Sequence, residues 1–174
     1  MDRHQNSTLA YVGSTPTWRA IFLKREYKNM AILNYTTSIA VEKTAGEIQN
    51  KLAKAGAQAV MSEYSEQILN AISFRMVCNG VMVSFRLPAQ IDRIYVLLQR
   101  DGKVPRKLKT REQAARVAWR IIKDWIEAQL AIVEAEQAEM VEVFLPYAQN
   151  PSTGQTLFEQ ISGNQFAMLE YKTH

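Results

Sequence analysis

A two-residue turn near the middle of the chain constrains its fold more than any other feature. Asn79-Gly80 separates two runs, residues 72–78 and 81–87, in which apolar and polar side chains alternate. A two-residue hairpin turn of type I′ needs positive φ at both central residues, and Asn-Gly meets that need well. The sequence therefore predicts an antiparallel hairpin over residues 72–87 with a fixed register.

The register that follows from this turn separates an apolar face from a mixed one. The apolar face pairs Cys78 with Val81, Met76 with Val83, Phe74 with Phe85 and Ile72 with Leu87. The opposite face pairs Val77 with Met82, Arg75 with Ser84 and Ser73 with Arg86. Because turn chemistry and side-chain alternation agree, we expect the apolar face to cover the core.

Patterns elsewhere predict the elements that complete the fold. Strands are predicted at 32–39 and 58–64, and short helices at 44–55, 91–98 and 157–161. Thr44, with Glu47 three residues later, is expected to cap the first helix, and Gly56 to end it. We therefore predict an α+β fold, in which a small antiparallel sheet (the hairpin and one or two further strands) packs against a short helix and one long C-terminal helix.

The long helix is predicted over residues 110–145. Thr110 and Gln113 have the spacing of a capping box, and Pro146 supplies the stop. At 1.5 Å per residue such a helix would be about 54 Å long.

Charge is segregated along this region. From residue 100 to residue 123 there are nine Lys or Arg and two acidic residues, whereas residues 124–142 contain six acidic residues and no base. Basic side chains near a helix N terminus oppose the helix dipole. We therefore expect an anionic partner, which is either a nucleic acid, a phosphate ligand or the acidic half of a second copy.

Composition excludes several classes of site. The 174 residues are 47% hydrophobic, which is enough for one core, and no apolar run reaches membrane-spanning length. Cys78 is the single cysteine, and the two histidines, His4 and His174, lie at the termini. We therefore expect no catalytic residue, no metal, no cofactor and no enzymatic activity, in a cytoplasmic protein.

The first 29 residues lack a sustained apolar period and contain five of the 21 basic residues. They are expected to be a disordered basic arm, or to precede a true start at Met30, since Lys24-Arg25-Glu26 can be encoded by purine-rich triplets resembling a ribosome-binding sequence. The predicted organisation is an arm at 1–29, one α+β domain at 30–147 and a C-terminal extension at 148–174.

Nine basic residues are candidates for polyanion binding. They are Lys103, Arg106, Lys107, Lys109, Arg111, Arg116, Arg120, Arg75 and Arg86. The first five surround a helix start, where free backbone N–H groups favour phosphate. The alternative for these five is a solvated loop, and for Arg75 and Arg86 it is a sheet face that is either solvated or covered by another element.

Arg116, Arg120 and Lys123 have a second interpretation. Glu112, Asp124 and Glu127 each lie four residues from one of them, so ion pairs within the helix would occupy their charge. The other acidic residues between 124 and 142 are expected on a solvated helix face; they are Glu134, Glu136, Glu139 and Glu142.

Three segments resemble small hypothetical proteins of phages and prophages of Gram-positive bacteria. They are Ile32-Leu33-Asn34-Tyr35-Thr36-Thr37, Phe85-Arg86-Leu87-Pro88-Ala89, and the run from Val104-Pro105-Arg106-Lys107 through Ala115-Arg116-Val117-Ala118-Trp119-Arg120-Ile121-Ile122-Lys123-Asp124-Trp125. The likeness implies a phage protein acting in a bacterial host cell and implies no particular chemistry. The order helix, three strands, helix is also similar to a double-stranded-RNA-binding domain, although residues 89–109 are an addition.

Three functions fit these features. The first is a non-enzymatic phage accessory protein that binds nucleic acid through the basic loop and helix N terminus. The second is a protein that sequesters a phosphorylated nucleotide signal of host defence, and the third is a self-assembling protein with no ligand. No membrane partner is expected.

The long helix also predicts a homodimer. Its apolar residues form two adjoining stripes, of which one can cover the hairpin and the other, including Trp125, can meet a second copy. Antiparallel pairing about Glu127 would bring Arg116 toward Glu139 of the partner, and Arg120 toward Glu134 or Glu136. Such a dimer would explain the charge segregation without a ligand.

Overall fold

The computed structural model describes residues 32–164 and 166 of the chain. By its contacts the chain divides into Met1–Ala31 and Ile32–His174, and every described residue belongs to the second unit. The predictions for residues 1–29, for a start at Met30 and for the last residues of the chain lie outside the described residues.

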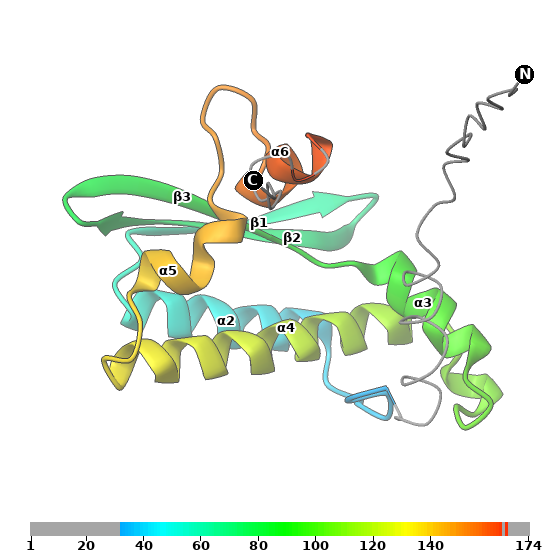
Figure 1. Ribbon diagram of the computed structural model, residues 1–174. Coiled ribbons are helices and arrows are strands. Elements are labelled where there is room, and N and C mark those ends of the chain that lie inside the picture. The colour runs from blue at the N-terminus through cyan, green and yellow to red at the C-terminus, as the bar shows by residue number, and fades with distance from the viewer. Residues whose placement is uncertain (1–31, 165, 167–174) are drawn as a thin grey trace, which may run out of the picture. The chain divides into compact units, whose positions relative to one another are not determined.

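The described unit has the predicted α+β architecture, with a three-stranded antiparallel sheet in the order β1-β2-β3. The strands are β1 (Ala59–Ser65), β2 (Ile68–Cys78) and β3 (Val81–Pro88). The α-helices are α2 (Val41–Lys54), α3 (Ile91–Arg100), α4 (Arg111–Glu134), α5 (Met140–Phe144) and α6 (Leu157–Gly163). Two short 3-10 helices are η2 (Arg106–Leu108) and η3 (Leu145–Tyr147). Helices α2 and α4 lie side by side beneath one face of the sheet (Figure 1).

The β2–β3 hairpin confirms the predicted register at every position. Asn79 and Gly80 have φ of 50° and 80°, as a type I′ turn requires. Phe74 opposes Phe85, their ring centroids are 5.0 Å apart, and both side chains are buried. Turn chemistry and apolar alternation act locally, which is why sequence alone identified this element.

The main core lies between the sheet and the helices. Trp119 and Ile126 of α4 are fully buried in it, and Trp119 Nε1 donates to the carbonyl of Leu69 at 3.0 Å. Phe144 of α5 is also buried. Its ring centroid lies 5.4 Å from that of Phe74 and 5.3 Å from that of Trp125, and both ring pairs are edge-to-face. Helix α5 therefore folds back against the core instead of extending α4.

The predicted strand at 32–39 is wrong, because this segment forms turns. The Tyr35 N–H donates to the Ile32 carbonyl at 3.3 Å, and Asn34 has a φ of 63°. The Gln113 side chain on α4 donates to the carbonyls of Tyr35 and Thr37 at 2.8 and 2.9 Å. These hydrogen bonds satisfy the backbone against α4, so β-branched composition does not produce a strand here.

The cap predicted for the first helix is also wrong. Helix α2 begins at Val41, three residues before Thr44. Thr44 is buried inside the helix, and its hydroxyl donates to the Ala40 carbonyl at 3.3 Å. Gly56 follows the helix with a φ of 98°, as a C-terminal glycine commonly does. The strand at 58–64 and the helices at 91–98 and 157–161 are confirmed, with ends shifted by a few residues.

A long helix is present, but it ends at Glu134 instead of residue 145. Its last turn closes with a Schellman motif, in which Gln137 N–H donates to the Ile132 carbonyl and Glu136 N–H to the Val133 carbonyl. Glu136 occupies the left-handed position, with a φ of 56°. Glycine usually occupies that position. Because Glu136 occupies it here, the sequence does not indicate that the helix ends at this point.

Residues beyond η3 contact the outer edge of the sheet. Ala148 forms a bridge with Phe85, and the Gln149 N–H donates to the Ser84 carbonyl at 2.7 Å. The chain then turns into α6, which Figure 1 shows on the side of the sheet opposite α2 and α4. The described part of the predicted C-terminal extension is thus joined to the sheet.

Candidate functional site

The basic loop between α3 and α4 is anchored from within by a small apolar cluster. Leu98 of α3, Val104 of the loop and Ala114 of α4 are buried together, and Leu108 packs against them. This cluster is separate from the main core. Burial of Val104 and Leu108 fixes the loop between the two helices.

Hydrogen bonds hold the loop at both ends. Gln99 Nε2 donates to the Lys109 carbonyl at 2.8 Å, and Lys109 Nζ donates to the Gln99 carbonyl at 2.9 Å. The Lys103 N–H donates to Asp101 Oδ1 at 2.8 Å. Lys109, one of the predicted phosphate ligands, is therefore part of the scaffold of the loop.

The charged side chains that remain on the loop point outward. Lys103, Arg106 and Lys107 are all exposed. Within residues 32–164, neither the Arg106 side chain nor the Lys107 side chain makes a hydrogen bond or an ion pair. These two cations are available to a partner without the loss of an internal contact.

Arg111, at the start of α4, is only loosely engaged. Its Nη2 lies 2.5 Å from Asp92 Oδ1, and its guanidinium carbon lies 5.8 Å from the centre of the Tyr95 ring. Both charged side chains are largely exposed, so this pair contributes little to stability and can be exchanged for another anion. Thr110 caps the helix as predicted, since its Oγ1 accepts from the Gln113 N–H at 3.1 Å. The predicted capping box is incomplete, because the Gln113 side chain donates to the carbonyls of Tyr35 and Thr37 instead of completing the cap.

The cations further along α4 are used inside the molecule. Arg116 pairs with Glu112 on the same helix, which confirms the alternative interpretation of that residue. Arg120 was expected to pair with Asp124 but instead donates to Glu47 Oε2 of α2 at 2.8 Å. Asp124 accepts from the Asn34 side chain at 2.7 Å.

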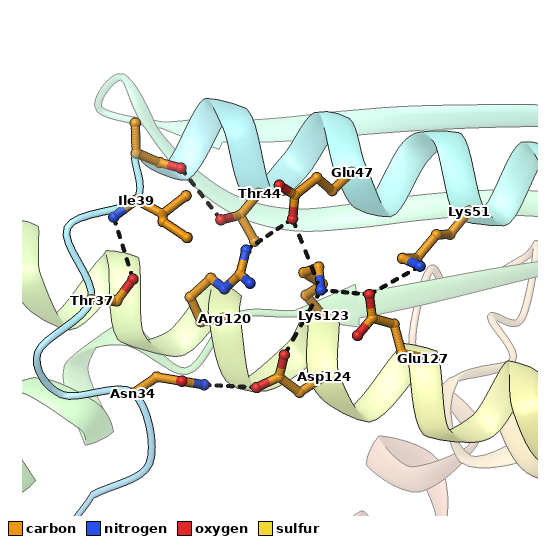
Figure 2. A network of polar contacts seen from close by, with 11 residues as sticks. Asn34, Thr37, Ile39, Thr44, Glu47, Lys51, Arg120, Lys123, Asp124 and Glu127 are labelled. Atoms are coloured by element: carbon orange, nitrogen blue, oxygen red, sulfur yellow. Dashed lines mark hydrogen bonds and ion pairs between the residues drawn. The ribbon is translucent and has the colours of Figure 1, made fainter.

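Lys123 lies at the centre of this network between α2 and α4 (Figure 2). Its side chain is 11% exposed and pairs with Glu127, and its Nζ lies 3.9 Å from both Glu47 and Asp124. Lys51 of α2 reaches Glu127 at 3.0 Å. Hydrogen bonds from Lys123 and then from Lys51 lower the pKa of Glu127. The network joins the two helices. It also neutralises Arg120, which the sequence analysis considered a candidate for polyanion binding.

The two arginines of the sheet differ in their surroundings. Arg86 Nε donates to Glu63 Oε2 at 2.9 Å, and Glu63 also accepts from the Ser73 hydroxyl. Arg75 is exposed and has no ion pair with another described residue. Of the two arginines predicted to bind phosphate on this face, only Arg75 is not neutralised by a described carboxylate.

Side chains suited to metal binding or to nucleophilic catalysis are few in the described part of the chain. Among residues 32–164 and 166, no cluster of three His, Cys, Asp or Glu side chains could hold a metal ion. Burial, followed by the charge of Glu139, raises the pKa of the Cys78 thiol. No helix in that part of the chain is long and apolar enough to cross a bilayer.

Comparison with known proteins identifies no relative: no protein-family model, curated protein or solved structure matches this chain.

Sequence reasoning overlooked two residues that organise the site. Glu47 was considered only as a helix cap, yet it accepts from Arg120, which lies 73 residues away along the chain. Gln113 was considered a capping residue, yet its side chain holds the turns at 35–37. No local pattern signals either contact, because both depend on how distant elements pack.

Proposed function

We propose that this protein binds nucleic acid without catalysing a reaction, through phosphate contacts made by the α3–α4 loop. The observation that carries the proposal is the exposure of Arg106 and Lys107 on an anchored loop, with no ion pair to any residue of 32–164. Arg86, Arg116 and Arg120 are excluded from the proposed surface, because internal carboxylates neutralise them.

The shape of this surface favours a long polyanion over a small phosphorylated ligand. Small ligands are usually enclosed in a pocket, whereas nucleic acid is bound along an open charged surface. The principal cavities formed by the described residues do not include Lys103, Arg106 or Lys107 in their walls. Sequestration of a nucleotide stays an alternative, which none of these five cavities supports at the loop.

The resemblance to phage and prophage proteins would place this binding in the cytoplasm of an infected bacterium. The antiparallel homodimer through the long helix also stays a prediction, but its premises have weakened. Helix α4 ends before Glu136 and Glu139, and Arg120 is paired with Glu47. Trp125, which was offered to a partner, packs against Phe144 and Tyr147 of its own chain.

The proposal is tested by fluorescence anisotropy of the full chain with labelled duplex DNA, duplex RNA and single strands at low salt. The double variant Arg106→Glu and Lys107→Glu should weaken binding at least about tenfold, because two phosphate contacts become repulsive. The matched control is Lys43→Glu with Lys54→Glu, which makes the same charge change at two exposed sites of α2. Equal losses in the two variants would show that net charge, not the loop, determines binding, and would refute the proposal.

A further inference from the structure

The outer face of α3 carries an apolar pair between two cations. Arg93, Val96, Leu97 and Arg100 are all exposed and lie on one side of the helix, and we call them the α3 ridge. Val96 is 42% exposed and Leu97 48%, while Leu98 on the opposite side is fully buried. Neither arginine of the ridge forms an ion pair with another residue of 32–164.

A groove of complementary character lies where α4 turns into α5. It has a volume of about 590 Å³ and is lined by Val77–Asn79 of the hairpin, Val133 of α4 and residues 136–142. Its apolar walls include Val133 and Val141, and three exposed carboxylates, Glu136, Glu139 and Glu142, lie among its lining residues. No Lys or Arg lines it. We call it the acidic groove.

Helix α3, which carries the ridge, and helix α5, which contributes to the groove, lie at opposite ends of α4 (Figure 1). This helix has 24 residues and is therefore about 36 Å long, so the two surfaces of one molecule cannot meet. We propose that copies of this chain associate head to tail, with the α3 ridge of one copy seated in the acidic groove of the next. Such a contact is heterologous and leaves a free ridge and a free groove at the two ends, so it builds open chains unless the rotation closes a ring.

A second copy fits the ridge better than the polyanion does. Phosphates would be matched by Arg93 and Arg100, but Val96 and Leu97 between them would gain nothing from a phosphate backbone. In the acidic groove, Glu139 accepts from Asn79 Nδ2 at 3.2 Å and Glu142 accepts from the Glu139 N–H at 3.4 Å, but no described cation neutralises either carboxylate. The groove therefore presents negative charge to the arginines, and it presents apolar side chains to Val96 and Leu97. The ridge is separate from the loop residues proposed to bind nucleic acid, so either proposal can fail alone.

The position of the only cysteine provides a direct test. Cys78 lies in the wall of the acidic groove, and residue 97 lies on the ridge. In the variant Leu97→Cys each molecule has one thiol on the ridge and one in the groove. Mild oxidation should give a ladder of disulfide-linked trimers and larger species on non-reducing gels. The reaction needs a pH high enough to form the Cys78 thiolate, because burial raises the pKa of this thiol.

Two controls define the result. Adding Cys78→Ser to Leu97→Cys should limit the products to dimers, because one thiol per chain remains. A cysteine placed at Lys43, exposed on α2, with Cys78 retained, should give no comparable ladder. Absence of species above a dimer for Leu97→Cys, or an equal ladder for Lys43→Cys, would overturn the proposal.

A non-covalent test uses variants that each keep one competent end. Arg93→Glu with Arg100→Glu inactivates the ridge, and Glu136→Gln with Glu142→Gln removes two charges from the groove without creating a site for the acidic ridge variant. Glu142→Gln keeps an oxygen that can accept from the Glu139 N–H. Light scattering at about 50 mM salt should show that the unmodified chain grows in mass with concentration and that each variant alone is monomeric. An equimolar mixture should give dimers, because one intact ridge meets one intact groove. A monomeric unmodified chain, or a mixture without dimers, would contradict head-to-tail association.

Discussion

Glu47 shows how one side chain determines the use of several charges. Its carboxylate accepts from Arg120 and lies 3.9 Å from Lys123, and these two cations are only 17% and 11% exposed. We expect Glu47→Gln to lower the free energy of unfolding by about 1–3 kcal/mol, because the charged partner of two largely buried cations is removed. Urea unfolding measures this change.

The control for that variant is Glu112→Gln. Glu112 pairs with Arg116 at the exposed surface of α4, so its loss should cost no more than about 0.5 kcal/mol. If the two variants lose the same stability, the network between α2 and α4 does not have the role assigned to it.

Residue-level predictions from the sequence succeeded where the partner is close along the chain. The cap at Thr110 and the pairs Glu112–Arg116 and Lys123–Glu127 are all separated by three or four residues, and all are present. The pairing of Arg120 was predicted wrongly, because Asp124 is engaged by Asn34 and Glu47 arrives from another helix. Spacing along the chain identifies candidate partners for a charged side chain, and the packing of distant elements determines which of them it contacts.

At the scale of an element, the end of α4 depends on a strained residue. Glu136 adopts a left-handed conformation that costs a non-glycine residue about 1–2 kcal/mol. We expect Glu136→Gly to raise the free energy of unfolding by about 0.5–1 kcal/mol, since part of the gain is offset by the flexibility of glycine in the unfolded chain. Calorimetry or urea unfolding measures the change.

Glu134→Gly is the matched control, because Glu134 is exposed and still helical. Glycine there should lower stability by about 0.5 kcal/mol, because Glu134 is the last residue of the helix. Opposite signs at positions two residues apart would confirm that backbone conformation, not the lost carboxylate, determines the effect. Destabilisation in both variants would contradict the interpretation of the helix end.

Elements differ in how much of their structure the sequence reveals. The hairpin was predictable to the residue because Asn79-Gly80 and the alternation of its strands give the same register. Segment 32–39 has strand-like composition, but Gln113 binds its carbonyls and keeps it in turns. The same limit applies to the site: the cations were identified from the sequence, but only the fold separates Arg106 and Lys107 from those used internally.

At the scale of the whole molecule, the segregation of charge along α4 resolves into three regions. The basic end presents an exposed loop, the middle is neutralised by α2, and the far end carries the carboxylates of the acidic groove. The antiparallel dimer predicted from the sequence requires charges of the middle region to pair with a second copy, although α2 already neutralises them. Within residues 100–142, charge that no described residue of opposite sign neutralises lies at the two ends of α4, including that on Arg106 and Lys107 and that on Glu136, Glu139 and Glu142.

This arrangement makes a quantitative prediction for the dependence of polyanion binding on salt. Each phosphate contact releases counterions, and two contacts, by Arg106 and Lys107, give a slope of about −1.8 when log affinity is plotted against log salt for duplex DNA. Raising salt from about 50 to about 200 mM should therefore weaken binding roughly tenfold. Anisotropy titrations at protein concentrations below self-association provide the measurement. Arg106→Gln with Lys107→Gln should bring the slope close to zero, because neutral side chains release no counterions, whereas Lys43→Gln with Lys54→Gln should leave it unchanged. A slope that the loop variant does not alter would place the phosphate contacts elsewhere on the molecule.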